Sequence, residues 1–413
     1  MSDRPRKSGH SSSERKGSIH QIRNLKLEEV KLEEQYEVLQ TLCEVWSGRI
    51  LLAEHRDSRH EVILKALHKV ATSRADFLRE FHYSYFLSPH RSIVTTYDVA
   101  FSTSDMFVFA EEYAQFGDLA CYVSNGGIGE RNTKLLAPQL VAALDFMHSK
   151  GLVHRNVRLD NILVFKSDLS RVKLADFDQT RPVGWRARRG DEWAPYAPPE
   201  VVSQPRGELY TVAAAHDTWQ LAVVLVVCLT GALPWQRADK TDARYAAFCQ
   251  WRGYRALRAP HRFGEFSLRL QSLLRRLFEP RARRRCAVTE IGRHLGHRWT
   301  ARSASAAAGD GVDAGDATSV CYSTWSVHSC QQQKNAVLAP LRALGLETVV
   351  DHDAKRQRLR DWVALTARGP ALEEEGGPEL TEGRGGGSQS SAASAASGPR
   401  HSPAGSLAEE DVE

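Results

Sequence analysis

The chain has 413 residues, 42% of them hydrophobic, and a formal net charge of +5. This length suffices for one large two-lobed domain with tails, or for two ordinary domains. The longest apolar run, residues 221–229, is far shorter than the roughly 20 residues that cross a bilayer, and the basic, Ser-rich start lacks the apolar stretch of a signal peptide. The mild charge argues against nucleic acid, because the arginines at 281–285 are best explained as a solvated segment beside a helix.

Seven scattered cysteines, none in a Cys-x-x-Cys pair, indicate reduced intracellular thiols and argue against a metal site built on cysteine. We therefore expect a cytoplasmic protein that does not enter a membrane. Residues 1–35 are predicted as a basic, Ser-rich tail followed by a short charged helix at 24–35.

From Tyr36 the pattern becomes strand-like, with Tyr36, Val38 and Leu42 expected on one face, and similar runs follow at 50–53 and 62–67. Residues 73–87 predict a helix that begins at Ser73, and residues 107–109 predict another strand. The clearest helix begins near Asn132 and ends at residue 151. It carries apolar residues at helical spacing: Leu135, Leu136, Leu140, Leu144 and Met147.

After residue 199 the pattern is helical to about residue 299. Strands first and helices later predict an α+β, two-lobed fold, with a β-rich N-lobe at about 36–113 and a helical C-lobe at about 114–299. Residues 300–413 are predicted as a low-complexity tail with disordered stretches, in which 334–366 offers apolar faces for one or two short helices.

Residues 154–161 read His-Arg-Asn-Val-Arg-Leu-Asp-Asn, and Asp176-Phe177-Asp178 comes fifteen residues after Asn161. This is the spacing of a protein kinase catalytic loop and its metal-binding loop. Lys65 in a strand, Glu80 on the next helix and Glu200 after two prolines complete the kinase order. The ordered set predicts a protein kinase fold over residues 36–299.

Among kinases, the chain resembles the family of SH3-domain-binding kinases. The resemblance rests on the hinge region at 107–119, on Leu144-Asp145-Phe146-Met147-His148, on residues 172–177, and on Leu229-Thr230-Gly231 followed by Pro234-Trp235. The family name suggests a proline-rich SH3 ligand. Neither tail contains Pro-x-x-P, and Pro195-x-x-Pro198 falls in the activation segment, so SH3 binding is not supported.

The resemblance implies roles for several residues. Lys65 would hold the α- and β-phosphates of ATP, and Glu80 would orient Lys65. Asn161 and Asp176 would offer hard oxygen ligands to Mg²⁺. The alternative for Lys65 and Glu80 is a surface lysine and a solvated carboxylate. The other candidate nucleotide-binding residues are Gly48, Ile50, Ile63, Glu112 and Tyr113.

Two further residues have architectural roles in the resemblance. Glu200 would pair with an arginine late in the domain, for which Arg283 is the expected position. Asp217 would tie down the backbone of the catalytic loop. Both roles argue for the fold and say little about activity.

The catalytic loop departs from the kinase pattern at the general base. Asn156 stands where kinases have an aspartate, and an amide has no usable basicity. Losing such a group costs about 10²–10⁴-fold in rate. Arg158 replaces the usual lysine and keeps its positive charge, but its planar fork is not an equivalent donor.

The phosphate-covering loop keeps only Gly48 of three glycines, because Cys43 and Val45 take the other two positions. Glu44 would add negative charge beside the phosphates. Ile63 replaces a small alanine above the adenine ring, and Glu111 brings a carboxylate to the back of the pocket.

Asp178 replaces the glycine that follows Asp176-Phe177. After Thr180 the activation segment contains no Ser or Thr up to residue 200, and Trp193 stands where a threonine would touch the catalytic loop. Asp191 and Glu192 would offer fixed negative charge to Arg155 or to the arginines at 186, 188 and 189; the alternative is a solvated charged loop.

These departures favour a pseudokinase, a kinase fold that acts as a scaffold or allosteric regulator through protein partners. The alternative is a weak or atypical Ser/Thr kinase that still uses ATP and Mg²⁺. If Ile63 and Val45 block the nucleotide, Asn156→Asp alone will not restore activity, and we expect that outcome.

Overall fold

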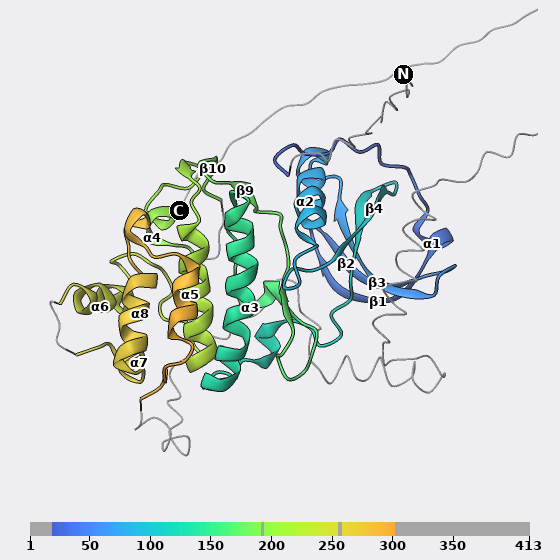
Figure 1. Ribbon diagram of the computed structural model, residues 1–413. Helices are drawn as coiled ribbons and strands as arrows, with labels where there is room; N and C mark the ends of the chain where they lie inside the picture. Colours follow the sequence, from blue (N-terminus) through green and yellow to red (C-terminus); the bar gives the residue numbers. More distant parts are fainter. Residues whose placement is uncertain (1–18, 125, 191–193, 255–257, 302–413) are drawn as a thin grey trace, which may run out of the picture. The chain divides into compact units, whose positions relative to one another are not determined.

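The computed structural model describes residues 19–301, apart from residues 125, 191–193 and 255–257 (Figure 1). The predictions of a disordered start, of a low-complexity tail and of short helices at 334–366 lie outside the described residues. Among the described residues, no helix combines the length and apolar character that a membrane span requires.

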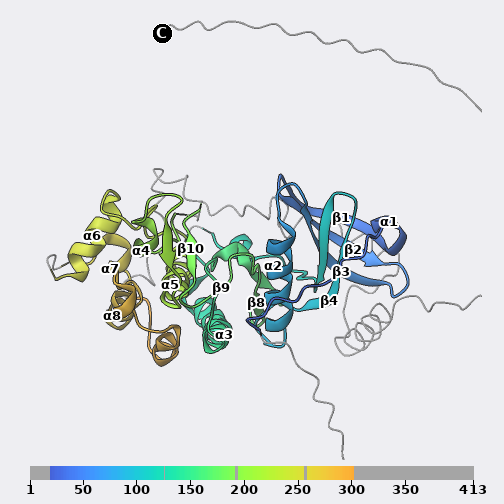
Figure 2. The same ribbon diagram turned by 90° about the horizontal axis from the view of Figure 1, so that it is seen from above.

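The N-terminal half of the described chain is built on one antiparallel sheet in the order β1-β2-β3-β5-β4. Helix α2 (Arg74–Leu87) leads from β3 to β4, and Ser73 caps it by accepting a hydrogen bond from the Asp76 N–H at 3.1 Å. Figure 2 shows α2 lying beside the sheet. Phe77 and Phe81 of this helix pack against Phe109 on β5. The strands are β1 (Tyr36–Val45), β2 (Gly48–His55), β3 (His60–His68), β4 (Thr96–Ser102) and β5 (Met106–Glu111).

Two predictions for the start of this half are wrong. The charged helix expected at 24–35 is reduced to α1 (Leu32–Gln35), because Ser102 on β4 binds the backbone of Glu28 and Val30 and holds that stretch extended. Tyr36 and Val38 do not share a buried face, since Tyr36 is buried and Val38 is 45% exposed. The two register irregularities of β1 lie after Val38, between Val38 and Gln40 and between Thr41 and Cys43, and they change the alternation before Leu42.

The C-terminal half is helical, as the sequence predicts. The expected helix at 132–151 is α3 (Gly129–Ser149), although Leu135 is exposed while Leu136, Leu140, Leu144 and Met147 are buried. The apolar run at 221–229 lies in α5 (Ala215–Thr230) and is buried. The other helices are α4 (Pro199–Val202), α6 (Ala243–Arg252), α7 (His261–Gly264) and α8 (Leu268–Leu277), with 3-10 turns at Leu119–Tyr122, Leu159–Asn161, Ala282–Arg284 and Val288–His294.

Three short strand pairs frame the loops that carry the candidate site, and none of them was predicted. They are β6 (Leu152–Val153) with β9 (Arg181–Pro182), β7 (Ile162–Val164) with β8 (Val172–Leu174), and β10 (Arg186–Arg188) with β11 (Leu209–Thr211). The catalytic-loop sequence at 154–161 runs between β6 and β7, and the Asp176 loop follows β8. A β-rich half followed by a helical half is the α+β plan expected from the sequence.

Candidate functional site

Lys65 lies at the centre of a buried ion-pair cluster. Its Nζ is 2.6 Å from Glu80 Oε1 on α2 and 2.7 Å from Asp176 Oδ1 after β8. Lys65 is only 6% exposed and Glu80 only 4%. The alternative of a surface lysine and a solvated carboxylate is therefore wrong, and the structure joins three residues that lie far apart in the sequence.

Asn156 completes the contacts of the Asp176 carboxylate. Its Nδ2 donates to Asp176 Oδ2 at 2.8 Å, while Asp176 Oδ1 accepts from Lys65. Asn161 Nδ2 donates to the Asn156 carbonyl, also at 2.8 Å. Both carboxylate oxygens of Asp176 are thus already engaged by protein donors, one of them the amide that replaces the expected base.

Arg158, the second predicted catalytic position, forms an ion pair with Asp160 of the same loop. Its guanidinium lies 3.1 Å from Asp160 Oδ2, and the Arg158 side chain is 10% exposed. Burial raises the pKa of Asp160 to about 6, with Arg158 opposing that rise. The positive charge at this position is therefore committed to a carboxylate of the same loop.

Two carboxylates, Glu80 and Asp176, contact the Lys65 ammonium, and Glu111 and Asp178 lie near enough to raise the pKa of Lys65 further. Burial raises the pKa of Glu111 to about 7 and that of Asp178 to about 6. Burial also raises the pKa of Asp176, but Lys65 outweighs it and holds that pKa below its usual range. Of the two carboxylates that depart from the kinase pattern, Asp178 adds negative charge beside the Asp176 loop, whereas Glu111, at the back of the pocket, is partly protonated near neutral pH.

The phosphate-covering loop is a tight hairpin. Strands β1 and β2 pair as far as Val45 and Gly48, so that only Trp46 and Ser47 form the turn. A Cβ on Gly48 would lie 2.3 Å from the Ala66 carbonyl oxygen, so the retained glycine is required for strand packing. Cys43, at a lost glycine position, is fully buried.

Glu44 does not act as the isolated negative charge that the sequence suggests. Its Oε1 accepts from Arg49 Nε at 2.8 Å across the hairpin, and both side chains are exposed. The charge beside the predicted phosphate position is therefore largely compensated.

Ile63 belongs to a small apolar cluster between the hairpin and the hinge. Buried Leu52, Ile63 and Tyr113 form its centre, and three partly buried residues pack against them: Leu39, Leu42 and Ile50. Several candidate nucleotide-binding residues thus pack on one another. An isoleucine in this cluster fills volume that an alanine would leave for an adenine ring.

Glu112, another candidate, is held by the protein itself. Its carboxylate forms an ion pair with Lys173 on β8 and accepts from the Thr95 N–H at 2.6 Å. Lys173 is 3% exposed and went unnoticed in the sequence. The sequence feature that could have indicated this ion pair is a lysine between two apolar residues, Val172 and Leu174, because a buried ammonium requires a partner of opposite charge.

The two residues expected to bind Mg²⁺, Asn161 and Asp176, are engaged by contacts within the protein. Both expected ligands are present, but Asp176 already accepts from the Lys65 ammonium and the Asn156 amide, and Asn161 Nδ2 donates to the Asn156 carbonyl. Lys65 remains suited to hold phosphates, with Glu80 orienting its ammonium. The cluster as a whole keeps the Lys65–Glu80 pair and both metal-ligand positions, with the Asp176 carboxylate engaged by donors of the protein.

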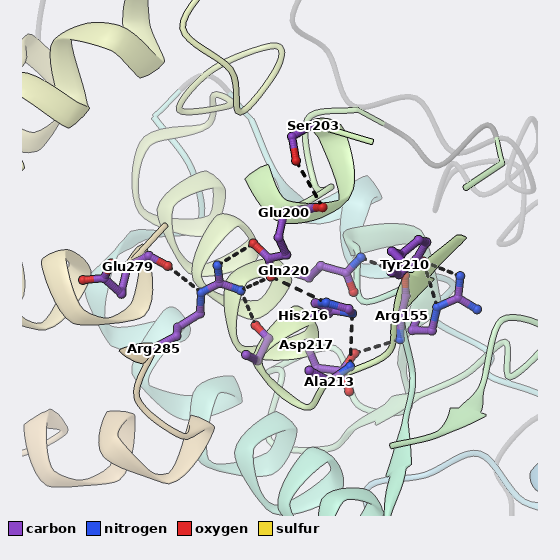
Figure 3. A network of polar contacts seen from close by, with 11 residues as sticks. Arg155, Glu200, Ser203, Tyr210, Ala213, His216, Asp217, Gln220, Glu279 and Arg285 are labelled. Carbon is purple, nitrogen blue, oxygen red and sulfur yellow. Dashed lines mark hydrogen bonds and ion pairs between the residues drawn. The ribbon is translucent and has the colours of Figure 1, made fainter. Parts of the chain in front are cut away.

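A network of buried polar contacts fixes the backbone of the catalytic loop (Figure 3). Asp217 accepts from the His154 N–H at 2.9 Å and from the Arg155 N–H at 2.8 Å, and its Oδ2 lies 2.8 Å from His148 Nε2. Gln220 accepts from the Val157 N–H at 3.0 Å and donates to the Arg155 carbonyl at 2.8 Å. The prediction for Asp217 is confirmed, whereas Gln220 and His148 were missed.

The partner of Glu200 is Arg285, so the prediction of Arg283 is wrong. Arg285 binds both Glu200 oxygens at 2.8 Å and donates to the Ala215 carbonyl at 2.7 Å (Figure 3). Arg283 is exposed in the 3-10 turn Ala282–Arg284. That turn directs the first arginines to solvent and brings Arg285 toward α5.

Arg155 is satisfied within the helical half. It bonds through Nε and a terminal nitrogen to the Tyr210 hydroxyl and donates to the Gln179 carbonyl at 2.9 Å. Asp191, Glu192 and Trp193 lie outside the described residues, so their proposed contacts stay predictions. Pro195-x-x-Pro198 is buried, in line with its expected structural role.

Comparison with known proteins identifies relatives that agree with this architecture. The profile of the protein kinase domain covers residues 36–299. The chain belongs to the protein kinase family. The serine/threonine-protein kinase meng-po of Drosophila melanogaster is 35% identical over 356 residues, which cover 84% of this chain and 78% of that kinase.

Two further relatives carry the SBK name. The serine/threonine-protein kinase SBK1 of Danio rerio is 35% identical, with 66% of this chain and 71% of that kinase covered. The serine/threonine-protein kinase SBK2 of Homo sapiens is 34% identical, with 68% and 82% covered. The resemblance to SH3-domain-binding kinases is confirmed, and this kinase-like chain thus joins relatives named as Ser/Thr kinases.

Proposed function

We propose that this chain is a pseudokinase that acts as a scaffold or allosteric regulator in intracellular signalling. The observation that carries the proposal is the hydrogen bond from Asn156 Nδ2 to Asp176 Oδ2 at 2.8 Å. A general base would have to accept a proton at this position, and Asn156 instead donates one to the residue that kinases use for Mg²⁺.

The surrounding groups support the same conclusion. Kinase domains generally use ATP and Mg²⁺, but Glu111 and Asp178 place additional carboxylates around Lys65, and Ile63 packs with Leu52 and Tyr113. A bound nucleotide would meet additional negative charge from Asp178 near its phosphates and the packed Ile63 side chain at its base. Under this proposal the chain works through contacts with protein partners in the cytoplasm.

A weak Ser/Thr kinase is the second candidate, and one observation favours it. The Lys65–Glu80 pair is formed at 2.6 Å, which is the arrangement that active kinases use to hold the α- and β-phosphates. Phosphate transfer depends mainly on positioning and electrostatics, so a slow reaction could survive the loss of the base.

We expect Mg²⁺ and ATP at about 5 mM nucleotide to leave the melting temperature of the purified full chain unchanged, because the nucleotide does not bind. A nucleotide that did bind, at 100 times its Kd, would add about 2.7 kcal/mol to the free energy of unfolding. Differential scanning fluorimetry would measure this. The control is Lys65→Met, which removes the phosphate-holding ammonium. A rise of several degrees that needs Mg²⁺ and disappears in Lys65→Met would contradict a closed site and favour the weak kinase.

A further inference from the structure

Residues 19–30 precede the region matched by the kinase profile, yet they are packed against it. In Figure 1 this segment, the dark-blue start of the described chain, passes over α2 and continues to α1. Ile22 packs against the cluster of Phe77, Phe81 and Phe109, which joins α2 to the sheet, and also against the large core of the helical half. Ile22 therefore joins the segment to both clusters, the larger of which includes Tyr83 and Leu87 of α2 itself.

His82 on α2 is the polar centre of this contact. Its Nδ1 accepts from the Arg23 N–H at 3.2 Å, and its Nε2 lies 2.9 Å from the Ile19 carbonyl oxygen. A neutral ring with the proton on Nε2 satisfies both bonds. His82 is fully buried, and burial lowers its pKa, which keeps the ring in this neutral form.

Further bonds hold the segment on either side of His82. Arg74, in the first turn of α2, donates to Asn24 Oδ1 at 3.2 Å and to the Leu25 carbonyl. The Arg23 guanidinium lies 3.0 Å from Asp98 Oδ1 on β4. Residues 23–25 of the segment thus bind both α2 and the edge strand β4.

The same segment reaches the end of α3. A Cβ added to Gly151 would lie 3.7 Å from the His20 ring. The segment therefore spans from Gly151, two residues after the end of α3, to the edge strand β4, and it also contacts α2.

Helix α2 is the element whose position decides whether Glu80 meets Lys65. Glu80 lies two residues before His82 on this helix, and its carboxylate is 2.6 Å from Lys65 Nζ. We propose that residues 19–30 form a built-in clamp that positions α2, so that the Lys65–Glu80 pair is kept without phosphorylation of the activation segment. The inference is independent of whether the chain transfers phosphate.

The Arg155 contacts agree with this role. Kinases commonly order the activation segment through an arginine that binds a phosphate. Here Arg155 is already bound by the Tyr210 hydroxyl and the Gln179 carbonyl. Positioning of α2 and anchoring of the catalytic-loop arginine are both provided by contacts within the chain.

The test uses the full chain with Ile22→Asp, the conservative control Ile22→Leu, and a truncation that removes residues 1–18 only. Hydrogen exchange is followed by mass spectrometry in α2, with α8 as internal reference. We expect Ile22→Asp to speed exchange in α2 by about tenfold and leave α8 unchanged. Ile22→Leu and the truncation are expected to match the parent chain.

A second readout reports on Lys65 itself. Loss of Glu80 from the pair should make Lys65 more reactive toward an acylating reagent, relative to Lys31, which is largely exposed. We expect Ile22→Asp to raise this ratio severalfold, and Glu80→Gln to raise it without faster exchange in α2. Faster exchange in α2 with unchanged Lys65 reactivity would overturn the proposal, because the segment would then only stabilise the helix.

If Ile22→Asp also loses the protection of α8, the protein has unfolded, and Arg74→Met replaces it. Arg74 is an exposed residue that contacts the clamp through Asn24 and Leu25. It is expected to change both readouts in the same direction by about threefold. Unchanged α2 exchange in a folded Ile22→Asp or Arg74→Met chain would refute the clamp.

Discussion

Arg285→Met is expected to lower the free energy of unfolding by about 3 kcal/mol, because it leaves the Glu200 carboxylate without its bidentate partner. The Arg285 side chain is fully buried, while that of Glu200 is 24% exposed. Partial access of Glu200 to water places the effect at the low end of the range for broken buried pairs. Methionine retains most of the side-chain volume over Trp219, so the loss reports on the charge and its hydrogen bonds.

The matched control is Arg283→Met, which removes the same group from an exposed position two residues earlier. We expect this variant to stay within about 0.5 kcal/mol of the parent chain. Urea unfolding followed by tryptophan fluorescence would measure both. Equal losses in the two variants, or no loss at Arg285, would show that Arg285 does not anchor Glu200.

Asn156→Asp is expected to destabilise the protein by about 2 kcal/mol near pH 7.5, because it places a carboxylate where an amide now donates to Asp176. Two facing carboxylates raise the pKa of one of them in the folded state. A raised carboxyl pKa lowers stability as pH rises from the unfolded value, about 4, through the folded value. The loss in free energy of unfolding of Asn156→Asp, relative to the parent chain, should therefore be smaller at pH 5 than at pH 7.5.

Asn24→Asp is the control for this change. The Asn24 side-chain oxygen accepts from Arg74, so an aspartate keeps the contact and should be neutral or slightly stabilising. Thermal unfolding of both variants at the two pH values would measure the difference. A stability of Asn156→Asp equal to that of the parent chain at pH 7.5 would mean that the hydrogen bond to Asp176 does not matter.

Much of the site could be predicted because kinase motifs fix chemistry at set spacings. Lys65, Glu80, Asn161 and Asp176 come together as the motif order implies. Asn156 was identified as a lost base, but its role as a donor to Asp176 needed the folded geometry, since the two residues are twenty positions apart.

Other features depend on contacts that sequence periodicity does not encode. Four arginines occupy positions 281 and 283–285, and only the turn at Ala282–Arg284 determines that Arg285 reaches Glu200. The stretch before α1 has helical composition, but hydrogen bonds to Ser102 hold it extended. In both places tertiary contacts outweigh local preference.

The most direct test of the central claim is phosphate transfer by the pure full chain, with Mg²⁺, labelled ATP and a generic protein substrate. We expect no transfer above that of Asp176→Ala, and no gain in Asn156→Asp, because Ile63, Glu111 and Asp178 still oppose the nucleotide. Transfer at ordinary kinase rates, about 1–100 per second, that is abolished by Asp176→Ala would contradict this expectation.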